Sequence, residues 1–359
     1  MEKLKNIKGV FLLAFLCFFI SCNKDDYTAI NVSPVELDLT QVPYPKLSDY
    51  HFFEGDLKDQ APSYGVLPYK PISELFTDYA QKKRFVWLPN SLKATYDGDG
   101  NVLNLPVGSA LIKNFYYNNV QPNNTTRIIE TRLMIRQNEG WIFAEYVWND
   151  EQTEAFLTIS GSETVVSWRD ENDVIRNINY RIPSAMVDCK RCHGLLSGEV
   201  TPIGIKPQNL NSNFSYANGT KNQLNMLIQF GYLEDNLPNS IATVVDYKDT
   251  SKALDLRVRS YFDINCAHCH KDDGEADHFG LRYDFNLTTD IENMGVGMPA
   301  EHTLTGYVGK IVYRNNVAQS ILHYRVNTET DNFYMMSPLG RTIRDSEGVQ
   351  LIEDWINSL

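Results

Sequence analysis

The sequence contains two copies of one five-residue pattern, Cys189-Lys190-Arg191-Cys192-His193 and Cys266-Ala267-His268-Cys269-His270. In each copy two cysteines are three residues apart, and a histidine follows the second cysteine directly. Residues i and i+3 lie on the same face of a helical turn, so both thiols of a copy point the same way. The two copies therefore predict two sites of the same chemistry.

The C-x-x-C-H spacing is that of covalent c-type haem attachment. Its two thiols form thioethers with one porphyrin, and the imidazole of its histidine binds the iron. The sequence thus predicts two covalently bound haem c groups. The attachment residues are Cys189, Cys192, Cys266 and Cys269, and the proximal iron ligands are His193 and His270.

Zinc binding, a redox dithiol and disulfides are the alternatives for such cysteine pairs. Zinc ribbons bring their two pairs within about 15–20 residues of each other, whereas 73 residues separate Cys192 from Cys266. A dithiol motif does not need the histidine that both copies carry. The spacing therefore favours haem over these alternatives.

The N-terminus has the pattern of an export signal. Three lysines precede an apolar run of 11 residues, 10–20, which suits the apolar region of a signal peptide and is too short to span a bilayer. The run ends in Phe19-Ile20-Ser21-Cys22, which resembles the lipobox of bacterial lipoproteins, although Phe19 replaces the usual small aliphatic residue. This resemblance implies cleavage before Cys22, lipidation of its thiol and anchoring to the outer membrane, periplasmic or surface-exposed. An ordinary secreted protein is the alternative.

Composition limits the possible partners. The 359 residues are 43% hydrophobic and 22% charged, as in a globular protein of two or three domains. The formal net charge of −12 disfavours nucleic acid as a partner. An acidic surface would attract a basic redox protein, whose identity the sequence does not give.

The first half of the mature chain has the alternation of β-strands. Residues 127–135 and 141–148 are strand-like and flank Asn138-Glu139-Gly140, which predicts a hairpin. Further strands with short polar turns predict a sandwich-like β-rich domain. The acidic stretch 97–101 lacks the final glutamate of a calcium-binding loop, so it predicts a tight turn.

After Pro183 the pattern changes to short helices and loops. Residues 251–264 predict a helix that leads into the second motif, and a last helix is expected from about Asp345, with Trp355 on its apolar stripe. A helix before C-x-x-C-H and a final helix with a packed aromatic residue resemble the frame of small monohaem cytochrome c domains. The fold class predicted is therefore α+β, a β-rich domain followed by mainly α-helical cytochrome c-type haem domains.

Five segments follow from these patterns. They are a lipoprotein signal peptide (1–21), a tether (22–45), the β-rich domain (46–182), a first haem-binding module (183–249) and a cytochrome c-like domain with the second haem (250–359).

In domains similar to the C-terminal one, a methionine before the last helix binds the face of the iron opposite the histidine. Met336 lies 66 residues after His270 in a polar loop and is the first candidate. The family pattern is methionine followed by proline, whereas Ser337 intervenes here, so Met335 is an alternative. Met298-Pro299 matches the dipeptide but lies far from the last helix. Ligation by histidine and methionine raises the reduction potential.

The opposite ligand of the first haem is less defined. Met226, 33 residues after His193 on a predicted helix, is the candidate, and Met186 lies just before the motif. An open iron or a histidine ligand is the alternative. The histidines outside the ligand positions lack a distinguishing context, and the position of His268 inside its motif argues against ligation. These histidines are His51, His278, His302 and His323.

Several further stretches resemble an uncharacterised family of exported bacterial dihaem c-type cytochromes. They include 76–89, 145–149, 180–189, 202–211 and 265–270, and they cover nearly all of the mature chain. The resemblance implies a β-rich domain and two haem-binding modules but does not supply a reaction.

We therefore expect a membrane-anchored dihaem cytochrome that transfers single electrons, rather than an enzyme. One alternative is a dihaem peroxidase-like enzyme in which one iron is open. The other is a binding lipoprotein whose β domain recognises a glycan or a protein.

Overall fold

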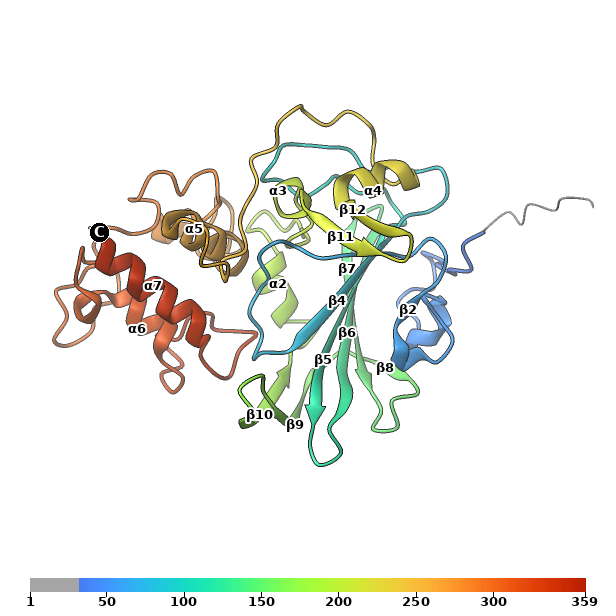
Figure 1. Cartoon of the computed structure of the whole chain (residues 1–359), viewed down its shortest axis with the longest axis horizontal. Helices are drawn as coiled ribbons and strands as arrows, with labels where there is room; N and C mark the ends of the chain where they lie inside the picture. The colour runs from blue at the N-terminus through green and yellow to red at the C-terminus, as the bar shows by residue number, and fades with distance from the viewer. Residues whose placement is uncertain (1–31) are drawn as a thin grey trace, which may run out of the picture. The chain divides into compact units, whose positions relative to one another are not determined.

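The centre of the fold is one antiparallel sheet of eight strands, which runs through the middle of Figure 1. In the computed structural model, which describes residues 32–359, six strands follow the order β10-β9-β5-β6-β7-β8, while β4 pairs with β5 and β3 with β4. The strands are β3 (Leu67–Tyr69), β4 (Gln81–Trp87), β5 (Ala110–Val120), β6 (Thr125–Gln137), β7 (Gly140–Trp148), β8 (Ala155–Thr158), β9 (Ser162–Arg169) and β10 (Ile175–Ile182).

The alternation of side chains gives this sheet two buried faces. On β5 and β6, Ile112 and Leu133 point into one apolar core, where partly buried residues of the N-terminal segment such as Val35 and Leu37 cover the sheet. Their neighbours Leu111 and Met134 belong to a second core on the opposite face. That second core is completed by side chains from the chain after the sheet, among them Ile205, Leu210, Leu224, Met226 and Leu227.

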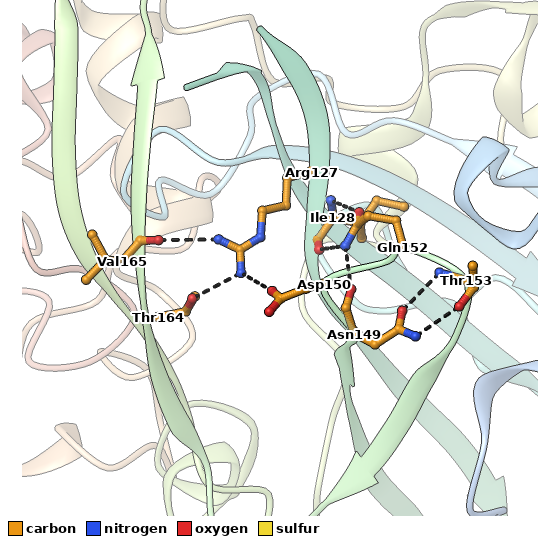
Figure 2. A network of polar contacts seen from close by, with 8 residues as sticks. All are labelled: Arg127, Ile128, Asn149, Asp150, Gln152, Thr153, Thr164 and Val165. Atoms are coloured by element: carbon orange, nitrogen blue, oxygen red, sulfur yellow. Dashed lines mark hydrogen bonds and ion pairs between the residues drawn. The ribbon is translucent and has the colours of Figure 1, made fainter. Parts of the chain in front are cut away.

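Local signals position the turns. The predicted hairpin is present, since Gln137 and Gly140 close the β6–β7 pair, and Gly140 adopts a φ of 133°, which an L residue rarely accepts. At the other end of β6, the Arg127 guanidinium bonds the Val165 carbonyl of β9 and the Asp150 carboxylate of the β7–β8 turn, at 3.3 Å and 3.2 Å (Figure 2). In the same network, Gln152 bonds both backbone groups of Ile128. These contacts connect β6 with β9 and with that turn.

The predicted fold class is wrong in two respects. The strands from β3 to β10 form one eight-stranded sheet, not a sandwich of two sheets, and the residues from Pro183 onward are not mainly helical but mostly loops and turns. Glycines such as Gly295 and Gly297, with φ of 85° and 76°, impose turns between the helices. The helices there are α2 (Asp188–His193), α3 (Pro207–Leu210), α4 (Gln223–Phe230), α5 (Leu254–Asn265), α6 (Ile321–Asn327) and α7 (Ser346–Ser358).

Short elements complete the described chain. They are the paired strands β1 (Phe53–Glu54) and β2 (Ala61–Pro62), the paired strands β11 (Asn213–Tyr216) and β12 (Gly219–Asn222), and the 3-10 helices η2 (Leu47–Tyr50), η3 (Leu57–Asp59), η4 (Asp277–Phe279) and η5 (Val317–Gln319).

The helices α5, α6 and α7 lie together beside the sheet (Figure 1). Both α5 and α7 occur where the sequence predicts helices, and their packing includes an edge-to-face contact between Phe262 and Trp355, with ring centroids 5.7 Å apart. Ser33–Leu359 form one compact unit. No helix within residues 32–359 is long and apolar enough to cross a membrane. The predicted signal peptide and the lipidation residue Cys22 lie outside the described residues.

Candidate functional site

The first C-x-x-C-H motif forms the short helix α2. The backbone amides of Asp188 and Cys189 donate to the Ser184 carbonyl, and the amide of Gly194 ends the helix by donating to the Lys190 carbonyl at 2.7 Å. Cys189 and Cys192 are half-buried. One helical turn thus presents both thiols and the His193 ring, as the spacing predicts.

The second motif begins where α5 ends. The amides of Cys266 and Ala267 both donate to the Phe262 carbonyl, and the amide of His270 donates to the Cys266 carbonyl at 3.0 Å. The motif is therefore held as a turn continuing from the helix. The aromatic core of α5 and α7 fixes its orientation, because Phe262 lies in that core.

Both motifs line the same cavity. It has a volume of about 250 Å³. The strands β5, β6 and β7 form one wall, and α6 and the loop 336–341 form another. The motif residues that line it are Cys189, Cys192, His193, Cys266, His268, Cys269 and His270.

Direct contacts join the two motifs. The metal-binding atoms of Cys192, His268 and Cys269 lie within 4.8 Å of one another, and the Cys269 thiol contacts the Arg191 carbonyl at 3.6 Å. The Arg191 guanidinium also pairs with Glu275 at 2.9 Å. Motif residues 78 positions apart in the sequence thus form one site.

Burial keeps the first cysteine of each motif in its thiol form. Burial raises the pKa of Cys189 to about 11 and that of Cys266 to about 12. Cys192 and Cys269, the second cysteines of the two motifs, affect each other in opposite ways. The hydrogen bond between their thiols lowers the pKa of Cys192 and raises that of Cys269. Cys192 is therefore the more readily ionised thiol of the site.

The two motif histidines are held as neutral imidazoles, the form that binds metal. Burial is the main cause that lowers the pKa of His193, and likewise of His270, to about 4. The Nδ1 atom of His193 lies 2.9 Å from the Thr201 carbonyl, an arrangement that leaves Nε2 free as a ligand. The Phe143 ring packs against the same imidazole, with centroids 5.3 Å apart.

Buried polar atoms without a partner surround His270. Within residues 32–359, its Nδ1, the Tyr283 hydroxyl and the Arg325 Nε are buried and form no hydrogen bond. All three residues line the cavity, and the Tyr283 ring lies edge-on to His270 at 5.3 Å. Burying such groups costs free energy unless a partner is supplied. These unpaired atoms lie beside the second motif, and each motif presents the groups that covalent haem attachment requires, two thiols and a neutral imidazole.

The structure separates the candidate methionines. Met336 lines the cavity, and its loop is fixed because its amide donates to the Arg325 carbonyl and its carbonyl accepts from Arg341. Met335, Met298 and Met186 are not among the lining residues. Met226 is not a lining residue either and packs in the second sheet core.

Sequence reasoning missed several residues of the site. Met134 and His302 line the cavity, but Met134 lies in an ordinary strand pattern and His302 in an unremarkable loop. His268 of the second motif, which we expected to be excluded from ligation, has a ring nitrogen within 4.8 Å of the Cys192 sulfur of the first motif. A row of charged strand residues also faces the cavity, and only its alternation within β5, β6 and β7 could have indicated it. Its members are Lys113, Arg132 and Glu145.

Comparisons with models of protein families, with curated proteins and with solved structures found no match for this chain.

Proposed function

We propose that the chain is an exported c-type cytochrome that carries two haem groups and transfers single electrons. What supports the proposal is that both C-x-x-C-H motifs and Met336 line a single cavity. In this proposal each cysteine thiol adds across a vinyl group of a porphyrin, so that an S–C bond forms and the thiol proton passes to carbon. No oxidant or reductant is consumed in that addition.

Different residues of the chain would bind the two haem groups. His193 and His270 would supply the nitrogen ligands of the two irons, and Met336 would supply a thioether ligand to the second iron. Haem iron bound in this way exchanges one electron at a potential set by its axial ligands. We do not extend the proposal to Met226, because its side chain packs in the second sheet core. Export and lipid anchoring at Cys22 are also part of the proposal, and their support comes from the sequence.

The test is a count of covalently bound haem in the mature chain, expressed with c-type haem maturation. We expect two haems in the unchanged chain. Replacing Cys189 and Cys192 by alanine should leave one, and replacing Cys266 and Cys269 by alanine should also leave one. A folded chain without covalent haem would contradict the proposal.

One observation favours a second candidate function, the binding of a thiophilic cation such as Zn²⁺. Cys192, Cys269 and His268 supply two sulfur atoms and a nitrogen within 4.8 Å of one another, a donor set that suits zinc. The variant His268→Ala distinguishes the two. It should leave both haems in place if the chain is a cytochrome, whereas a zinc protein would contain no haem and would lose most of its metal.

A further inference from the structure

A row of charged residues crosses the sheet beneath the first motif. Arg84 on β4 is paired with Lys113 on β5, Lys113 with Arg132 on β6, and Arg132 with Glu145 on β7. Directly opposite residues of an antiparallel sheet point to the same face. Lys113, Arg132 and Glu145 line the cavity that also contains Cys189, Cys192 and His193.

Two cations of this row already have acidic partners. The Arg84 guanidinium pairs with Glu74 at 2.7 Å, and only 6% of its side chain is exposed. Arg132 pairs with Glu130, whose carboxylate also accepts from the Tyr180 hydroxyl at 2.6 Å. The carboxylates of Glu74 and Glu130 are thus already paired with these two arginines.

Lys113 differs from these two cations. Its ammonium forms no hydrogen bond or ion pair within residues 32–359, and its neighbour is the Phe115 ring, 4.7 Å from the ring centre. Arg84, Lys82 and Arg132 surround it with positive charge. A half-buried ammonium among cations is unfavourable unless an anion is supplied.

The remaining acid of the row does not supply that anion. Glu145 is separated from Lys113 by Arg132 in the row, and one of its buried oxygens has no hydrogen bond. Burial and the neighbouring Glu130 charge raise the pKa of Glu145 well above its usual value, which favours the neutral acid. Burial and the neighbouring cations also lower the pKa of Lys113 well below its usual value, so the ammonium form at this wall of the cavity requires an anion beside it.

We propose that Lys113, with Arg132 beside it, forms an anion site that receives the carboxylates of the porphyrin attached at the first motif. This inference rests on the proposed function. It assigns a positioning role to strand residues outside both motifs. A cation at this place stabilises the reduced form of the haem and so raises its reduction potential.

The experiment is a redox titration of the haem-loaded chain, with visible spectra, for Lys113→Met, Lys113→Arg and the control Lys82→Met. Lys82 is a cation of the same sheet that bonds the Ala80 carbonyl and does not line the cavity. A background with Cys266 and Cys269 replaced by alanine assigns the signal of the first haem.

We expect Lys113→Met to shift the reduction equilibrium of the first haem about tenfold toward the oxidised form, about 59 mV for one electron. Lys113→Arg should retain the wild-type potential, Lys82→Met should shift it less than Lys113→Met does because Lys82 does not line the cavity, and the spectra of all three should match the wild type. If Lys113→Met does not fold, a wild-type potential in Lys113→Arg supports the site and a changed one overturns it.

Two results would overturn the inference. One is an unchanged potential in Lys113→Met. The other is an altered spin state in both Lys113→Arg and Lys113→Met, because the amine would then be an iron ligand. Absence of haem from the unchanged chain would instead refute the proposed function, and the haem count separates that failure from these two.

Discussion

At the scale of single residues, the two motifs were predictable because their chemistry is contained in five consecutive positions. Met336 could be proposed because its loop precedes the last helix. Lys113 and Arg132 could not, because charges within a strand pattern are as typical of a solvent-facing strand as of a cavity wall. The difference depends on what covers the sheet, and here that is a segment beginning more than 50 residues after Arg132.

The ion pair of Glu74 and Arg84 predicts an acid-dependent loss of stability. Burial opposes ionisation of Glu74, but the Arg84 and Lys70 charges outweigh it and lower its pKa from 4.5 to about 2. The carboxylate therefore stabilises the fold above pH 4.5, by at most about 3 kcal/mol, and this contribution disappears as the pH falls toward 2. Unfolding by urea at pH 7 and pH 3 should show a smaller pH dependence for Glu74→Gln than for the control Glu139→Gln, which removes an exposed carboxylate. Equal pH dependence in both variants would refute this role.

Met336 as an iron ligand predicts a specific redox change. Replacing Met336 by alanine removes the soft thioether that favours Fe(II), so the potential of the second haem should fall by at least about 59 mV, a tenfold change in the equilibrium. Met335→Ala should leave it unchanged, because Met335 does not line the cavity. Spectroelectrochemistry of both variants checks this. The reverse pattern would make Met335 the ligand.

At the scale of elements, local signals predicted some parts and failed for others. The β6–β7 hairpin and the helices α5 and α7 follow from a turn sequence and from apolar periodicity. The single sheet does not, since β5 pairs with β9 only at Val120 and Trp168, a long-range contact with no local signal. The mainly helical interpretation failed because the motif residues sit in one turn of helix or just after a helix, and a C-x-x-C-H spacing specifies no more than that.

The helix α4 offers a test of local stabilisation. The Asn222 side chain accepts hydrogen bonds from the amides of Leu224 and Asn225, at 3.0 Å and 3.3 Å. Asn222→Ala should lower the free energy of unfolding by about 1 kcal/mol, whereas Asn222→Asp should retain most of it, because a carboxylate also accepts these bonds. Denaturant titration measures both. Equal losses would show that another contact of Asn222, such as its bond to Asn211, dominates.

At the scale of the whole molecule, the two motifs belong to one cavity bounded by the sheet and by the helices α2, α5 and α6. Sequence reasoning placed them in two successive modules, and nothing in the linear order indicates that Cys192 and Cys269 meet. The sheet contributes its charged face to the site, so it is more than a support for the motifs.

Lipid anchoring concerns the whole chain. If Cys22 carries lipid, the expressed protein should sediment with membranes, and Cys22→Ala should release it into the soluble fraction with its haem count unchanged. Lys24→Ala, a change next to the same cysteine, is the control and should remain with the membranes. Membrane association of Cys22→Ala would exclude a lipid anchor at this residue.

The most direct test of the central claim is a redox titration of the haem-loaded chain beside the two variants that each lack one cysteine pair. Two attached haems predict two reversible one-electron steps, with one step lost in each variant. The reduction potential of each remaining step should also shift. The two attachment sites adjoin, and each variant lacks the charge of the neighbouring haem. A chain without reversible steps, or two variants whose remaining steps match the unchanged chain, would contradict it.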